Sequence, residues 1–223
     1  MRYPLAIVLL LAAVAAWGQD APTYEVGDLV VAVTDAKLRI RREGKVVEAD
    51  EVFPGVTMRV GAVKGRWLWV SNGVPGWIEN KNVIPLDKAI DFFTAKIRRY
   101  PTVAKWRYAR AVAWTNQGEL DIAIADYTEL LKLRRSPAYY HVRGICYHAK
   151  GEYDKAISDY NQAIRLNPKS ARYYNSRAEA KHEQGDALAA IEDAQQAIKL
   201  NPQYASAYTN LGRAHEENGD LMR

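Results

Sequence analysis

Two patterns of hydrophobic and polar positions divide the chain. Between residues 24 and 86, short apolar runs alternate with polar positions and are bounded by turn residues, as in Trp67-Leu68-Trp69-Val70. This period of two is typical of β-strands with one buried face. From about residue 87 onward the chain repeats a helix-turn-helix unit. The sequence therefore predicts two domains, a small all-β unit followed by an all-α unit.

Six runs are the predicted strands of the first unit. They cover residues 29–33, 38–41, 45–47, 57–63, 67–71 and 76–78. With five or six short strands in about 60 residues, we expect a small barrel.

The helical part repeats at an interval of 33 or 34 residues. Residues 137–170 form one complete unit, and its Ala156 recurs as Ala190 in the next unit. Ala123 and Ala89 precede Ala156 at the same interval. The loop residue Pro168 likewise recurs as Pro202. A fixed interval of this length predicts a solenoid, in which each unit packs only on its neighbours.

The complete units resemble tetratricopeptide repeats (TPRs), which carry a small residue where their two helices cross. The crossing pairs here are Ala111 with Ala123, Gly144 with Ala156, and Ala178 with Ala190. A larger side chain at a crossing would force the helices apart at about 1–3 kcal/mol. The predicted segments are a half-repeat helix at 87–102, repeats at 103–136, 137–170 and 171–204, and a truncated repeat at 205–223.

The TPR resemblance implies a concave wall made by the first helix of each repeat. The implied wall residues are Lys105, Tyr108, Val112, Thr115, Asn116, Ala138, His141, Ile145, His148, Ala149, Arg172, Asn175, Glu179, His182 and Glu183. Some TPR proteins grip a C-terminal carboxylate on this wall, but Tyr108 and Val112 occupy those positions here, so that activity is not expected. The mixed wall suits an extended or helical peptide.

Each complete repeat also places an arginine 16 residues before an aspartate. The pairs are Arg110 with Asp126, Arg143 with Asp159, and Arg177 with Asp193. We expect these charges to join the helices, within or between repeats. The alternative is independent surface charges, which would contribute less than about 1 kcal/mol each.

Residues 24–86 resemble the bacterial SH3-like family. The shared features are Gly65-Arg66-Trp67-Leu68-Trp69-Val70, then Gly76-Trp77 and a closing Val83-Ile84-Pro85. The resemblance implies an SH3-like barrel that binds peptidoglycan or peptides. Trp67, Trp69 and Trp77 form a candidate ligand surface, and the alternative is that at least two of them are packed in the barrel or against the next domain.

The N-terminus has the features of a signal peptide over residues 1–18, followed by a linker at 19–23. Arg2 supplies a positive charge, the run from Leu5 to Ala16 is apolar, and Ala16-Trp17-Gly18 suits a signal peptidase. The apolar run is shorter than the roughly 20 residues of a membrane-spanning helix, so an uncleaved anchor is the less favoured alternative. We expect an exported protein, periplasmic or extracellular, with no stable membrane span after cleavage.

Charge and chemistry narrow the function classes. The net charge of +5 comes mainly from residues 87–136, with 10 basic and 6 acidic side chains. We interpret this as a solvated face rather than a nucleic-acid site, because export separates the protein from nucleic acid. Cys146, the single cysteine, is expected to be a buried hydrophobe rather than a reactive thiol. His141, His148 and His182 suggest zinc, but scattered histidines are the more common explanation, so no metal, cofactor or enzyme activity is expected.

These observations favour an exported interaction scaffold that binds a protein or peptide on the concave wall. Two alternatives stay open. One is a cell-wall protein whose SH3-like unit binds peptidoglycan or its stem peptide. The other is the non-catalytic N-terminal part of a longer protein, since the fourth repeat lacks its second helix.

Overall fold

The computed structural model describes residues 23–42, 45–71 and 75–219. The predicted signal peptide at 1–18 and nearly all of the linker at 19–23 lie outside these residues. The chain divides into two compact units, with the boundary between Ala89 and Ile90. Each unit is described by itself.

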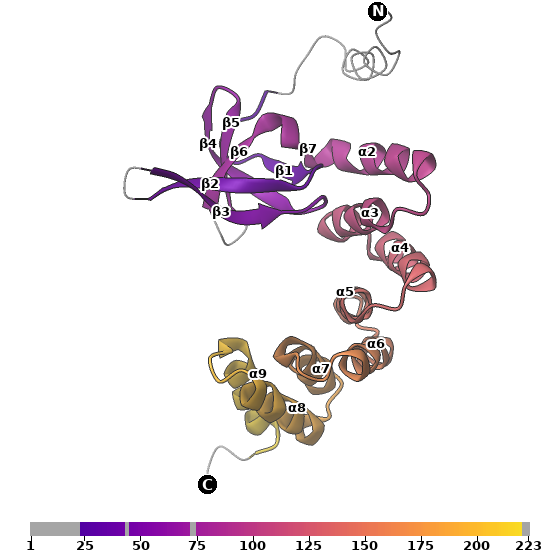
Figure 1. The fold of residues 1–223 in the computed structure, drawn as a ribbon. Helices are drawn as coiled ribbons and strands as arrows, with labels where there is room; N and C mark the ends of the chain where they lie inside the picture. The colour runs from indigo at the N-terminus through magenta and orange to yellow at the C-terminus, as the bar shows by residue number, and fades with distance from the viewer. Residues whose placement is uncertain (1–22, 43–44, 72–74, 220–223) are drawn as a thin grey trace, which may run out of the picture. The chain divides into compact units, whose positions relative to one another are not determined.

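The first unit contains an antiparallel sheet (Figure 1). Its strands are β1 (Leu29–Ala32), β2 (Ala36–Arg42), β3 (Lys45–Val52), β4 (Thr57–Lys64), β5 (Trp67–Ser71), β6 (Pro75–Glu79) and β7 (Val83–Pro85), in the order β3-β2-β6-β5-β4-β1-β7. A 3₁₀ turn, η1 (Asn80–Asn82), joins β6 to β7. The barrel and its SH3-like family stay predictions.

All six predicted strands are present, but the expected total of five or six is wrong because β7 adds a seventh. Val83–Pro85 is a strand because it pairs with β1, and so short a segment shows no alternation of its own. The third strand also extends beyond the predicted end at Val47, to Val52, because its polar residues continue the pairing with β2.

One face of the sheet forms the core of this unit. Val30, Leu38, Met58, Leu68 and Ile78 are buried there, as the period of two predicts. Strands β2 and β6 pack closely at Gly76, where an added Cβ would lie 2.6 Å from the Cβ of Leu38. Strands β2 and β6 therefore approach each other closely only because position 76 has no side chain.

The second unit is built from helices joined by short turns (Figure 1). They are α2 (Leu86–Arg99), α3 (Ala104–Asn116), α4 (Leu120–Leu133), α5 (Pro137–Ala149), α6 (Tyr153–Leu166), α7 (Ala171–Glu183), α8 (Ala187–Leu200) and α9 (Ala205–Glu217). The first turn of α2, residues 86–89, belongs to the first unit. Helices α3/α4, α5/α6 and α7/α8 pack as pairs, and each pair packs on the next. We call α3, α5, α7 and α9 the A helices, and α2, α4, α6 and α8 the B helices.

Each A helix ends at a glycine turn. Gly118, Gly151, Gly185 and Gly219 have φ values of 81°, 74°, 90° and 75°. This left-handed conformation costs little for glycine, and it stops the helix and starts the turn to the B helix.

The small residues of the helix crossings are buried. Ala111, Ala123, Ala156, Ala178 and Ala190 are at most 1% exposed. At the sixth crossing position, Gly144, an added Cβ would lie 2.6 Å from Cε1 of Tyr160 on α6. A ring therefore fills the space that a side chain at position 144 would need.

The three predicted Arg–Asp pairs are confirmed, and each is bidentate. In the second repeat, Arg143 donates from Nε to Asp159 Oδ2 at 2.8 Å and from Nη2 to Oδ1 at 2.7 Å. Arg110–Asp126 and Arg177–Asp193 have the same geometry, at 2.6–2.8 Å. All three aspartates are 4% exposed, so the alternative of independent surface charges is wrong.

A third bond from each arginine reaches the preceding B helix. The Nη1 groups of Arg110, Arg143 and Arg177 donate to Thr94, Thr128 and Asn161 in turn, at 3.1, 2.9 and 2.5 Å. Each guanidinium thus joins the two helices of its own repeat to the repeat before it. The pairs set both the crossing within a repeat and the stacking between repeats.

Candidate functional site

The A helices lie next to one another and form a continuous wall, and α4, α6 and α8 lie on its other side (Figure 1). Between α3 and α5, the rings of Tyr108 and Tyr139 are 5.8 Å apart, and Thr115 Oγ1 lies 3.6 Å from Cys146 Sγ. Cys146 is 1% exposed, which confirms its interpretation as a buried hydrophobe. We call this surface the A-helix wall.

Two of the residues expected on the wall surface are instead buried in it. His141 and Asn175 are 5% and 6% exposed. Nε2 of His141 on α5 forms a hydrogen bond with Oγ of Ser176 on α7 at 2.9 Å. Asn175 Oδ1 on α7 accepts from Asn210 Nδ2 on α9 at 3.1 Å. These buried bonds fix the spacing of successive A helices, so the two side chains support the wall and do not present themselves to a ligand.

His141 is held in its neutral form by its surroundings. Its ring lies 4.9 Å from that of Tyr173 and 5.7 Å from that of Tyr160. Burial, with a smaller contribution from the Arg172 guanidinium, lowers the pKa of His141 to about 4. At neutral pH the imidazole therefore acts as an uncharged hydrogen-bonding group of the wall.

The remaining predicted wall residues differ in exposure. Exposed ones are Lys105, Asn116, Ala138, Ile145, Ala149, Arg172 and Glu183, and half-buried ones are Tyr108, Val112, Thr115, His148, Glu179 and His182. Ile145 is 40% exposed, a large apolar side chain at the middle of the wall. The surface is apolar along α5 and charged along α7.

A fourth row of wall residues, which was not predicted from the sequence, lies on α9. Arg213 Nη2 lies 3.1 Å from Glu183 Oε1, and Glu217 Oε2 lies 2.5 Å from His182 Nδ1. The repeat interval could have predicted this row. The positions 34 residues after the wall residues of α7 are Ser206, Thr209, Arg213, Glu216 and Glu217. Helix α9 therefore extends the wall.

The three histidines considered for zinc do not meet. His148 packs its ring 5.5 Å from Tyr153, and its buried Nε2 has no hydrogen-bond partner among the described residues. Nδ1 of His182 lies beside the Glu217 carboxylate, and Nε2 of His141 forms a hydrogen bond with Ser176. Within the described part of the chain, no group of three or more His, Cys, Asp or Glu side chains is placed to hold a metal ion.

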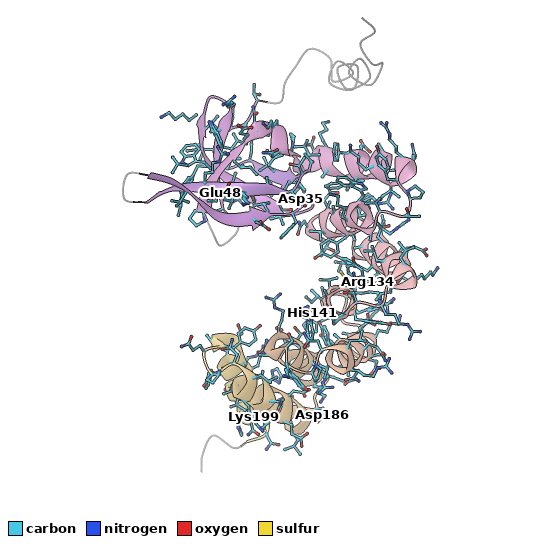
Figure 2. The ribbon with its side chains drawn as sticks, viewed as in Figure 1. Asp35, Glu48, Arg134, His141, Asp186 and Lys199 are labelled. Atoms are coloured by element: carbon cyan, nitrogen blue, oxygen red, sulfur yellow. The ribbon has the colours of Figure 1, made fainter. Side chains whose placement is uncertain are left out.

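The three tryptophans of the sheet lie on the face opposite its core. Trp69 and Trp77 are paired across β5 and β6, with ring centroids 5.4 Å apart and edge-on. Trp67 carries the Arg39 guanidinium 5.1 Å above its ring and lines a hollow of about 400 Å³. Figure 2 labels Asp35 and Glu48, which line the same hollow. All three rings are half-buried and outside the core cluster, so packing inside the sheet's core is not their role.

No helix in the described ranges combines the length and the apolar character that crossing a membrane requires. This finding covers α2 to α9 alone.

Comparison with protein-family models finds the TPR repeat in residues 144–185 and 179–219. A search of curated proteins returns no match. Among solved structures, the chain is similar to MamA residues 41 to the end from Desulfovibrio magneticus RS-1, at 20% identity, 60% of this chain, 77% of that chain and a TM-score of 0.58.

Two further structures are similar. One is a tetratricopeptide repeat protein from Parabacteroides merdae ATCC 43184, at 21% identity, 60% of this chain, 54% of that chain and a TM-score of 0.57. The other is the first TPR of Spaghetti (RPAP3) bound to the HSP90 peptide SRMEEVD, at 23% identity, 52% of this chain, 93% of that chain and a TM-score of 0.50. At these identities the likeness is one of fold.

Proposed function

We propose that this protein, whose helical unit carries tetratricopeptide repeats, is an interaction scaffold that binds a protein or peptide on the A-helix wall. The observation that carries the proposal is the contrast within that wall. Exposed side chains such as Ile145 and Arg172 stand on a floor fixed by buried polar bonds between A helices. A rigid surface of this kind binds a segment without losing its own conformational entropy.

The wall's chemistry limits what fits. Along α5 the exposed residues are apolar, Ala138, Ile145 and Ala149. Further along the wall, the exposed carboxylates Glu183, Glu216 and Glu217 outnumber the exposed cations Arg172 and Arg213, of which Arg213 pairs with Glu183. The ligand that complements this order is an extended or helical segment with an apolar anchor followed by basic side chains. The peptide named in the RPAP3 structure ends differently, in an acidic Glu-Glu-Val-Asp.

A matched pair of substitutions tests this assignment. Peptides selected against the wild-type protein by phage display are measured for binding to Ile145→Glu and to Ser158→Glu, whose exposed position lies on the B helix α6. A buried charge at the anchor site weakens binding by at least about tenfold, while the B-helix control leaves it unchanged. Equal binding to both variants would place the ligand elsewhere.

Export is part of the same proposal. The features of residues 1–18 support cleavage near Gln19 and a mature protein outside the cytoplasm. Cell fractionation with N-terminal sequencing of the mature protein tests this. A cytoplasmic protein that retains its initial residues would refute export and leave the peptide-binding proposal standing.

A second candidate function rests on the tryptophan face of the sheet. Exposed parts of paired indole rings stack well on sugar rings and on peptide side chains, and Trp69 and Trp77 offer such a pair. The ligand would be a cell-wall glycan or stem peptide. Retention on purified sacculi that is lost in Trp69→Ala, and kept in Ile145→Glu, supports this candidate; no retention of the wild-type protein rejects it.

A further inference from the structure

A hollow on the B-helix side of the repeats has features of a second binding site. It lies between the C-terminal end of α4 and the helix α5, and its volume is about 490 Å³. The residues that line it include four cations and two side chains with apolar surface: Lys132, Arg134, Arg135, Arg143, Leu133 and Tyr140. Arg143 faces the B helices, because it bonds to Thr128 on α4 and Asp159 on α6. We call this hollow the basic groove; it is separate from the A-helix wall.

The groove contains cations that the fold does not use. Arg143 is paired with Asp159, and Lys132 with Glu129 at 2.6 Å. Arg134 and Arg135 are exposed, and neither guanidinium has a hydrogen bond or ion pair with any residue that the structure describes; the backbone N–H of Arg134 caps α4 by donating to the Leu130 carbonyl. Figure 2 labels Arg134 where the chain leaves α4. Two unpaired guanidinium groups therefore stand at the rim.

The equivalent loops of the next repeats show what these positions normally do. After α6 and α8 the chain continues as Leu166-Asn167-Pro168 and Leu200-Asn201-Pro202. Each asparagine Oδ1 accepts from the backbone N–H two residues on, from Lys169 at 3.3 Å and from Gln203 at 3.1 Å. An asparagine in this role makes a local turn.

After α4 the loop is one residue shorter, and two arginines replace the asparagine and proline. The turn-forming bond is therefore absent from Leu133-Arg134-Arg135-Ser136 within the described residues. Lys132 already supplies one cation to the last turn of α4, as Arg165 does in α6 and Lys199 in α8. Arg134 and Arg135 are therefore additional to the charge that complements the helix dipole.

The floor of the groove is partly apolar. Leu133 is 52% exposed and Tyr140 is half-buried beside the guanidinium of Arg143, 5.8 Å from its ring. A planar guanidinium pairs with a carboxylate through two parallel N–H···O bonds. An occupant that uses all of these groups carries carboxylates and an adjacent apolar side chain.

We propose that the basic groove binds an acidic segment of a partner protein, with carboxylates on Arg134 and Arg135 and an apolar side chain on Leu133 and Tyr140. The site is independent of the A-helix wall. A partner that reached both surfaces would gain affinity through the linkage of the two contacts.

The test uses the full mature chain and a fluorescent synthetic peptide in which glutamates alternate with leucines, measured by fluorescence anisotropy. The variant Arg134→Gln/Arg135→Gln removes the two free cations. The control Arg165→Gln/Lys169→Gln removes the same charge from the end of α6 and the loop after it. The proposal expects about a tenfold loss of affinity in the first and less than about a twofold change in the second.

Four further measurements separate the explanations. A peptide with glutamines in place of glutamates should not bind, and added salt should weaken the glutamate peptide, since exposed charges are screened. Ile145→Glu should leave this binding unchanged, so failure of the A-helix wall and failure of the groove are distinguishable. Equal losses in both double variants, or no loss in either, would overturn the proposal. Displacement of the peptide by millimolar inorganic phosphate would also overturn it, in favour of a phosphate site.

Discussion

The buried Arg143–Asp159 pair offers the sharpest test of what holds the repeats together. Replacing Arg143 with Ala removes the two bonds to Asp159, at 2.7 and 2.8 Å, and the bond to Thr128 at 2.9 Å. The Asp159 side chain is 6% exposed and would be left as a buried carboxylate without its partner. Breaking a buried pair in this way costs about 3–5 kcal/mol.

For a unit of the size of residues 90–223, each kcal/mol corresponds to roughly 3–4 °C in melting temperature. Arg143→Ala should therefore lower the melting temperature of the helical unit by roughly 10 °C. The melting temperature is measured by far-UV circular dichroism. The control is Lys155→Ala, which breaks the Lys155–Glu152 pair. That pair has the same 2.7 Å separation, but Lys155 is 64% exposed. Such a surface pair contributes less than about 1 kcal/mol, so the control should melt close to wild type.

A double-mutant cycle then separates the pair from its parts. Arg143→Met combined with Asp159→Asn removes both charges, so its cost should be smaller than the sum of the single costs by about 1–3 kcal/mol. If Arg143→Ala melts with the wild type, or if the single costs simply add, the pair does not join the helices energetically. The geometry would then be incidental to stability.

Three further predictions test the packing and the buried groups. Gly144→Ala should destabilise the fold by about 1–3 kcal/mol, because its Cβ would lie 2.6 Å from the Tyr160 ring. The control Gly212→Ala has no atom within 4 Å of its added Cβ and should be neutral or stabilising by up to about 1 kcal/mol. Equal effects of the two substitutions in urea denaturation would contradict close packing of the helices at Gly144. In the folded protein the pKa of His141 is lowered from 6.5 to about 4, so between these pH values the unfolded state binds more protons than the folded state. The free energy of unfolding should therefore be highest above pH 6.5 and fall as the pH drops toward 4. It should depend less on pH in His141→Gln. Burial raises the pKa of the Cys146 thiol, so it should react with a thiol reagent at the rate of local opening, and immediate labelling of the folded protein would show it to be accessible.

The repeat interval was enough to predict the helices and the Arg–Asp pairs. Complementary charges at one spacing in three copies, such as Arg110 with Asp126, meet in every copy because the copies share one geometry. The third partner of each arginine was not predicted. It was detectable, since Thr94 and Thr128 precede Arg110 and Arg143 by 16 and 15 residues.

Burial within the wall could not be predicted from the interval alone. A position in the repeat fixes the face of a helix, but the neighbouring A helix decides whether that face is covered. His141 is covered because Ser176 and Tyr173 lie on the next A helix, and Asn175 because Asn210 does. Both polar partners lie 35 residues further on, which is the signal that was available.

In the sheet, alternation placed the tryptophans of β5 and β6 on one face and the apolar core residues on the other. Alternation assigns residues to a face but does not show what covers it. The pairing of Trp69 with Trp77 depends on the register of β5 and β6, which turn geometry sets and the sequence leaves open.

The most direct test of the central claim is site-specific photo-crosslinking of the intact protein in its native cells. A photoreactive amino acid is placed in turn at Ile145 and Arg172 on the A-helix wall, and at Ser158 on α6. The account predicts one protein adduct, the same from Ile145 and Arg172, and none from Ser158. Adducts of equal yield at all three positions, or an adduct from Ser158 alone, would contradict the claim that the A-helix wall is the docking surface.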